Sequence, residues 1–220
     1  MIWLKHKFRC CSVFIAALVF LCSLANADES PGQTNGAKES PGTRDPRETL
    51  EPVIRSFHAA FSQSDRTVTL QAANAMLIRK EDIIALFGEE FADLGDLMEL
   101  NREGYLLRIE IAMMKAPGKP LEPGYSEDTE YRLIDQRKEK QSMYRDVLPL
   151  IPPEVPVYRA VARGGSGAYL YVNSRWIWFP GFHSVVAVRN DLKEILPQAR
   201  AQVARMKEER QKLKDALTDE

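Results

Sequence analysis

Two short segments rich in aromatic and apolar residues constrain the fold of this chain more than any other feature. "AYLYV" at 168–172 and "RWIWF" at 175–179 are separated only by Asn173-Ser174. Strand-forming segments joined by two residues predict a β-hairpin whose turn residues both adopt positive φ. Asn adopts that backbone conformation readily, whereas Ser does so less often. The sequence therefore predicts an antiparallel pair of strands here.

A two-residue turn also determines which residues of the two strands face each other. Tyr169 then lies opposite Trp178, and Tyr171 lies opposite Trp176. Side chains alternate between the two faces of a sheet, so these four rings share one face. The other face is expected to carry the apolar side chains of Val161, Leu170, Ile177 and Phe179.

A third strand precedes the hairpin. The segment "VPVYRAVA" at 155–162 is rich in β-branched residues, and a Gly164–Gly167 turn would pair Val161 with Leu170. The "GGSG" of that turn leads into a strand, whereas phosphate-binding loops and nucleophile elbows lead into a helix. We therefore interpret it as a hairpin tip and expect a three-stranded antiparallel meander at about 155–180.

The N-terminal half of the chain has the apolar spacing of helices. Segments 50–61, 79–88 and 91–111 place apolar residues three and four positions apart. Gly104, inside the longest segment, either breaks the helix or marks a close approach to a neighbouring element. We expect an α+β fold in which 48–190 form a single domain. Its helical half packs on the meander, and a long C-terminal helix follows.

Two segments are ambiguous in their secondary structure. Residues 67–77 are expected to be helical, although three β-branched residues at 67–69 also suit a strand. Residues 129–149 form either one helix or a short strand at 131–134 followed by a helix. Apolar periodicity alone does not separate these alternatives.

The first 27 residues have the three-part layout of a secretory signal peptide. A basic start is followed by the apolar run 11–24 and by the small-residue site Ala25-Asn26-Ala27. The apolar run is shorter than the roughly 20 residues that a membrane-spanning helix needs. We expect a secreted or periplasmic protein cleaved after Ala27, with an uncleaved N-terminal anchor as the alternative. Residues 28–47 are rich in Pro, Gly, Ser and charged residues, which indicates a disordered linker.

Cleavage of the signal peptide changes the composition of the chain. All three cysteines lie within residues 1–27, so the mature chain would have no thiol for a disulfide, for catalysis or for zinc. It would carry 27 basic and 31 acidic residues, a balance that argues against nucleic-acid binding. No second apolar run follows, so we expect no transmembrane segment after cleavage.

The aromatic face of the meander is the best candidate for a ligand-binding site. If it is open, its rings form a platform that stacks on sugar rings or apolar ligands; if helices cover it, the rings belong to the core. The sequence predicts no catalytic residue, no metal ion and no cofactor, and the acidic face at 89–99 is typical of a solvated helix. The candidate ligand-binding residues are Tyr169, Tyr171, Trp176, Trp178 and His183.

Residues 191–220 are expected to form an amphipathic C-terminal helix with heptad spacing. Such a seam indicates a helix that packs on its own domain, or a coiled coil that mediates self-association or docking to a partner protein. Pro197 is expected to kink or restart the helix, which leaves only a short coiled coil. The seam has Arg210 as its one polar member: Leu192, Leu196, Ala199, Val203, Met206, Arg210, Leu213 and Leu217.

The hairpin "LYVNSRWIWFPG" resembles the strand–NG–RW hairpins that end many secreted proteins of planctomycete-type bacteria, some of which resemble NTF2-like α+β folds. The resemblance covers 152–182, implies an α+β fold and carries over no catalytic residue. We expect an exported, non-enzymatic binding or assembly module of the cell envelope. The alternative is a small-ligand-binding protein or a hydrolase-type enzyme that uses the aromatic face as its pocket.

Overall fold

The chain folds as an α+β protein, as the sequence predicts. The structure is a computed structural model, and it describes residues 46–121, 132–140, 142–161 and 168–218. The predicted signal peptide, nearly all of the predicted linker and the Gly164–Gly167 turn lie outside these described residues. Within the four stretches, no helix is both long enough and apolar enough to cross a lipid bilayer.

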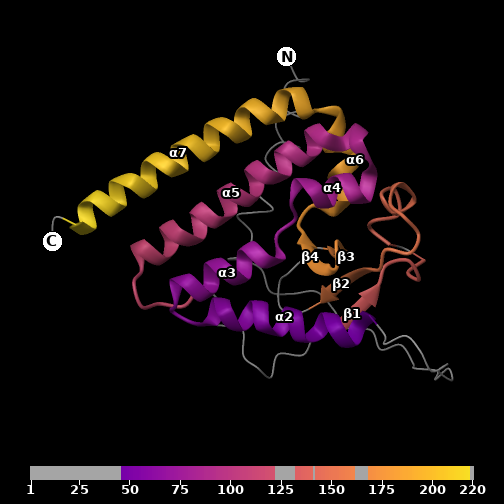
Figure 1. Cartoon of the computed structure of the whole chain (residues 1–220), viewed down its shortest axis with the longest axis horizontal. Helices are drawn as coiled ribbons and strands as arrows, with labels where there is room; N and C mark the ends of the chain where they lie inside the picture. The colour runs from indigo at the N-terminus through magenta and orange to yellow at the C-terminus, as the bar shows by residue number, and fades with distance from the viewer. Residues whose placement is uncertain (1–45, 122–131, 141, 162–167, 219–220) are drawn as a thin grey trace, which may run out of the picture.

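Four long helices lie side by side in the order α2, α3, α5 and α7 (Figure 1). Their bounds are Pro46–Ser62, Arg66–Met76, Ala92–Lys115 and Leu192–Thr218. The short helices are α4 (Lys80–Phe87) and α6 (Val185–Asn190), and the 3-10 turns are η2 (Glu89–Phe91), η3 (Leu148–Leu150) and η4 (Phe182–Ser184).

The ambiguous segment 67–77 is helical. Helix α3 begins at Arg66 because the side chain of Asp65 accepts hydrogen bonds from the backbone N–H groups of Thr67 and Val68, at 2.8 and 3.0 Å. Such a cap satisfies N–H groups that a helix start leaves without partners. The cap outweighs the strand preference of the β-branched residues beside it.

Within the described residues the sheet has four antiparallel strands in the order β1-β2-β3-β4, one more than predicted. They span Arg132–Asp135, Val157–Val161, Ala168–Val172 and Arg175–Phe179. Strand β1 confirms the strand alternative for 131–134. The helix expected after it is wrong, because the described residues from 136 to 149 form turns and the start of η3.

The predicted β3–β4 hairpin is confirmed residue by residue. Tyr169 faces Trp178 and Tyr171 faces Trp176. The turn residues Asn173 and Ser174 have φ values of 49° and 60°, as a two-residue turn of type I′ requires.

The predicted register between β2 and β3 is wrong by four residues. Leu170 faces Val157 instead of Val161. A shift by an even number leaves every side chain on the same face of the sheet, so the apolar pattern that specifies the faces does not distinguish the two registers. The separation into an aliphatic and an aromatic face is therefore correct although the pairing is not.

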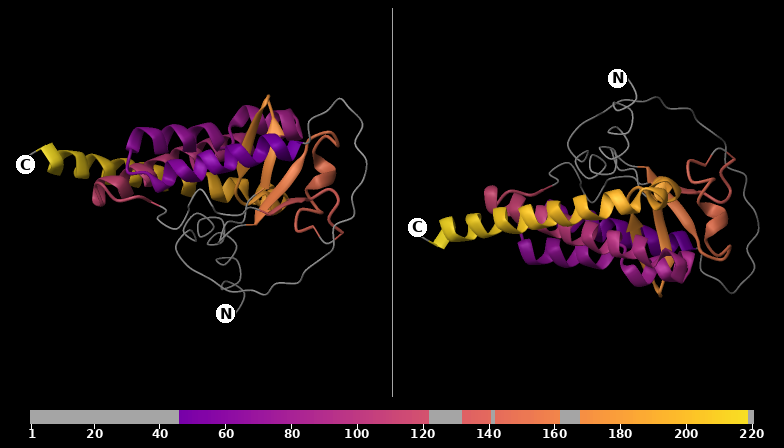
Figure 2. Two further views of the ribbon diagram at one scale, coloured as in Figure 1. Left: turned by 90° about the horizontal axis from the view of Figure 1, so that it is seen from below. Right: turned by 90° about the horizontal axis from the view of Figure 1, so that it is seen from above.

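Each face of the sheet is covered by its own set of helices, and the sheet crosses one end of the helical layer (Figure 2). The aliphatic face packs with α4, α6 and the first half of α5; we call this cluster the aliphatic core, and its strand members are Val157, Ala168, Leu170, Val172, Ile177 and Phe179. The aromatic face packs with α2, α3 and the second half of α5; this aromatic core includes Tyr158, Ala160, Tyr169 and Trp176.

Candidate functional site

The structure places two of the four predicted rings in the aromatic core and leaves the other two partly accessible. Tyr169 and Trp176 are 6% and 5% exposed, whereas Trp178 is half-buried and Tyr171 is 42% exposed. The indole Nε1–H of Trp176 donates a hydrogen bond to Thr49 Oγ1 at 3.1 Å. This bond fixes the ring against the first turns of α2 and satisfies its polar group.

Ring contacts connect the aromatic face to the helices that cover it. Trp178 lies 5.7 Å from Tyr105 in an edge-on arrangement and 6.2 Å from Phe57. Tyr171 stands edge-on to Trp176 at 5.3 Å. A fifth ring that the sequence analysis missed, Tyr158, packs edge-on to Trp176 at 6.0 Å. Among these rings, Tyr171 is the most exposed and Trp178 is partly accessible.

His183 belongs to the opposite side of the sheet. It lies in η4, and its buried neighbour Phe182 packs against Phe179 of the aliphatic core with ring centroids 5.3 Å apart. His183 is exposed, and partial desolvation lowers its pKa. The structure thus groups the four rings on one side of the sheet and places His183 on the other.

A buried ion pair that the sequence analysis missed anchors the hairpin to the helices. Asp82, in the first turn of α4, is fully buried and pairs with Arg175 at the start of β4. Its Oδ1 accepts a hydrogen bond from the side chain of Asn173 at 3.0 Å, and its Oδ2 accepts one from the backbone N–H of Arg79 at 2.9 Å. Burial lowers the pKa of Arg175, and the Asp82 carboxylate opposes that shift. Asp82, Arg175 and Asn173 therefore have a structural role, because they attach the β3–β4 hairpin to α4.

Two carboxylates of the acidic face at 89–99, those of Asp96 and Glu99, are paired with cations. Asp96 pairs with Lys80 Nζ at 2.7 Å, and Glu99 pairs with Arg102 at 2.6 Å while also accepting the backbone N–H of Lys80 at 3.0 Å. Within the described stretches, no group of three or more His, Cys, Asp or Glu side chains is arranged to hold a metal ion.

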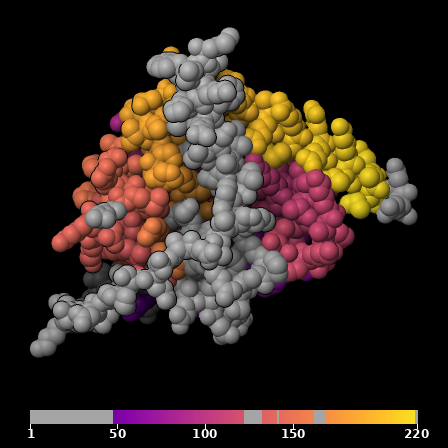
Figure 3. Space-filling model, turned by 180° about the vertical axis from the view of Figure 1, so that it is seen from behind, coloured from indigo at the N-terminus to yellow at the C-terminus, as the bar shows by residue number. Residues whose placement is uncertain are grey.

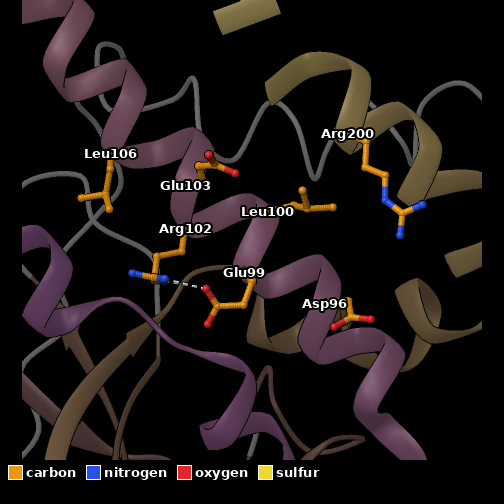
Figure 4. Close-up of a pocket in the computed structure, with 7 residues that line it drawn as sticks. All are labelled: Asp96, Glu99, Leu100, Arg102, Glu103, Leu106 and Arg200. Carbon is orange, nitrogen blue, oxygen red and sulfur yellow. Dashed lines mark hydrogen bonds and ion pairs between the residues drawn. The ribbon is translucent and has the colours of Figure 1, made fainter. Parts of the chain in front are cut away.

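An open groove of about 570 Å³ runs along α5 from Asp96 to Leu106, with Arg200 of α7 at its side (Figure 4). Its lining combines charged and leucine side chains: Asp96, Glu99, Leu100, Arg102, Glu103, Leu106 and Arg200. Six of these residues come from α5, and only Arg200 comes from α7. Arg102 is held in place by a 2.6 Å hydrogen bond to the side chain of Asn74 in α3.

On the side of α5 that faces α7, the two helices form a tight seam, and from behind they lie side by side (Figure 3). Leu107 and Ile111 of α5 pack with Val203 and Met206 of α7. At Gly104, a Cβ atom would lie 3.0 Å from the terminal methyl group of Met206. The close-approach interpretation of Gly104 is thus confirmed, and the helix runs through it without a break.

The polar member of the predicted heptad seam, Arg210, meets a buried carboxylate. Glu110 of α5 accepts a hydrogen bond from Arg210 at 3.2 Å and lies 3.6 Å from Lys214 Nζ, both in α7. It also pairs with Arg66 at the start of α3. Glu110 therefore ties three helices together, and Arg210 has a partner within its own chain.

In the part of the chain that the structure describes, the edge of the aromatic face at Tyr171 and Trp178 and the charged groove along α5 are surfaces that a ligand or partner could reach. Sequence reasoning missed the groove because its lining depends on which helix lies beside α5. No known protein family, no curated protein and no solved structure matches the chain significantly.

Proposed function

We propose that this protein is an exported binding or assembly module of the cell envelope that performs no chemical reaction of its own. Its ionisable side chains support this, because many of them hold helices together. Three carboxylates along α5 pair with cations of α3, α4 and α7, and the buried carboxylate of Asp82 pairs with Arg175. Engaged in this way, these groups act as fixed structural charges.

The groove along α5 is the observation that carries the proposal. Protein interfaces combine apolar anchor points with a rim of polar and charged groups. The groove has both, because Leu100 and Leu106 lie among three carboxylates and two guanidinium groups. Its openness suits a segment of another protein better than an enclosed small molecule, which pockets usually bury almost completely.

The test has two measurements on cells that produce the full chain. The N-terminal residue of the exported protein, read by mass spectrometry, is expected to be Asp28. In gentle extracts of the cell envelope, the protein is expected to elute at a mass well above the 25.0 kDa of the whole chain. The proposal is overturned if the protein is retained in the cytoplasm, or if it elutes from extracts as a free single chain.

The aromatic edge supports a second candidate, a small-ligand-binding protein. Tyr171 is exposed, and Trp178 is half-buried between Phe57 and Tyr105. After cleavage, Trp176 and Trp178 would be the only tryptophans, so intrinsic fluorescence reports on this face directly. Titration with oligosaccharides should then shift the emission of wild type and leave that of Trp178→Phe unchanged. Saturation curves that are identical for the two proteins would exclude this face as the site.

A further inference from the structure

Helices α5 and α7 pair with a regular heptad register. Glu103 pairs with Lys207 at 2.6 Å, and seven residues further along each helix Glu110 lies beside Lys214 at 3.6 Å. Residue numbers rise together along the two helices, so they run parallel. Ion pairs at heptad spacing beside an apolar seam are the arrangement of a parallel two-stranded coiled coil. We call these cross-helix pairs the rungs.

The same register places Asp96 opposite Arg200, one heptad before the first closed rung. There the rung is not formed, because the carboxylate of Asp96 pairs with Lys80 of α4 instead. Among the described residues, Arg200 has no ion-pair partner, although its side chain is exposed and lines the groove. Figure 4 shows it reaching from α7 toward the end of the groove where Asp96 and Leu100 lie.

The charged side chains that line the groove differ in whether they have an ion-pair partner. Three carboxylates, those of Asp96, Glu99 and Glu103, are each matched by a cation: Lys80, Arg102 and Lys207. Among the described residues, the guanidinium of Arg200 is the charged group of the groove lining that has no ion-pair partner, and it lies beside two partly buried leucines. A partner complementary to this surface presents one carboxylate to Arg200 and apolar side chains to Leu100 and Leu106.

The length of the groove indicates how that partner is shaped. From Asp96 to Leu106 the axis of α5 advances by about 15 Å at the rise of an α-helix. That distance accommodates almost three turns of another helix, whose side chains three and four positions apart would meet both leucines and Arg200.

We propose that the open rung of the α5–α7 pair is a docking site for an acidic amphipathic helix of a partner protein, whose carboxylate pairs with Arg200 and completes the rung. This inference rests on the proposed function and names the chemistry of its partner. The proposed docking does not use the apolar seam of α7 that could mediate self-association, because that seam already packs against α5.

The experiment places a photo-crosslinking amino acid at Leu106 of the full chain in producing cells and identifies the attached peptide by mass spectrometry. The expected peptide has helical spacing of apolar residues and at least one Asp or Glu within about three helical turns of the crosslink, the distance from Leu106 to the Arg200 end of the groove. Arg200→Glu should lower the crosslink yield about tenfold, since a like charge then faces the partner's carboxylate. Arg200→Lys should retain most of the yield.

The matched control is Arg205→Glu, which makes the same charge change at an exposed site five residues further along α7 and outside the groove. Circular dichroism of each variant checks that the helices are retained. A neutral or basic captured peptide, or equal losses in Arg200→Glu and Arg205→Glu, overturns the docking site while leaving the assembly function in place. The absence of any capture, together with a single-chain elution from envelope extracts, overturns both.

Discussion

Asp82 and Arg175 form an ion pair inside the protein although 93 residues of chain separate them. The carboxylate is fully buried, and the guanidinium also donates a hydrogen bond to the carbonyl oxygen of Ala75 at 2.7 Å. The pair therefore joins the β3–β4 turn to the start of α4, and Arg175 also joins it to the end of α3. It covers the outer edge of β4, where Leu77 also bridges to Trp178.

We expect Asp82→Ala to destabilise the protein strongly. The change leaves Arg175 and the side chain of Asn173 without their acceptor. The expected loss is about 3 kcal/mol, at the lower end for a broken buried pair because Arg175 remains partly accessible to water. Urea unfolding followed by circular dichroism measures it. Glu81→Ala removes the neighbouring, exposed carboxylate and should change the unfolding free energy by less than about 0.5 kcal/mol.

Tyr144 should make the protein less stable at alkaline pH. Burial of this ring raises the pKa of its hydroxyl to about 12. Between pH 10 and 12 the unfolded chain loses this proton while the folded chain keeps it, so the unfolding free energy falls by about 1.4 kcal/mol per pH unit. Tyr144→Phe should abolish that part of the slope, and the exposed Tyr171→Phe should preserve it. Equal slopes for wild type and Tyr144→Phe would contradict the assignment.

The parts of the fold that were predictable from sequence are those set by neighbouring residues. The turn at Asn173-Ser174, with strands that touch it directly, determines its own register. The cap of α4 at Gly88, whose φ of 93° favours glycine, is local in the same way. The register of β2 against β3 depends on a longer connection, and the apolar alternation is compatible with any even shift.

The candidate site depends on long-range contacts that carry no sequence signal. The heptad spacing predicts that α7 buries one apolar stripe, but it does not predict that the partner helix is α5 of the same chain. Arg210 is an interruption of that stripe in the sequence and an ion-pair partner of Glu110 in the structure. The aromatic face is a second example. Nothing in the sequence of the strands indicates that α2 covers Trp176 and leaves Tyr171 exposed.

Gly104 should tolerate only a small side chain. Alanine favours a helix by about 1 kcal/mol over glycine, but its Cβ would press on the flexible end of Met206 at 3.0 Å. We expect these effects to nearly cancel in Gly104→Ala. Gly104→Leu should cost about 1–3 kcal/mol, because it overfills the seam with Val203 and Met206. Thermal unfolding of the two variants, compared side by side, measures this difference. A leucine variant as stable as wild type would show that α7 moves away freely.

Glu110 should control how firmly the C-terminal half of α7 is held. Glu110→Gln weakens the ion pairs with Arg66, Arg210 and Lys214. The cations are partly exposed, so we expect a loss of about 1–2 kcal/mol. Hydrogen exchange should accelerate in the second half of α7 and stay slow in the first half, which packs on the aliphatic core.

Two comparisons separate this role of Glu110 from a general effect of charge. Glu209→Gln breaks the exposed pair between Glu209 and Lys115, and it should change stability by less than about 0.5 kcal/mol. Raising the ionic strength should speed exchange in the second half of α7 in wild type, since salt screens its rungs, and have less effect in Glu110→Gln. Exchange that accelerates uniformly along α7 would instead mean that the helix is released as a single unit from its packing on the aliphatic core.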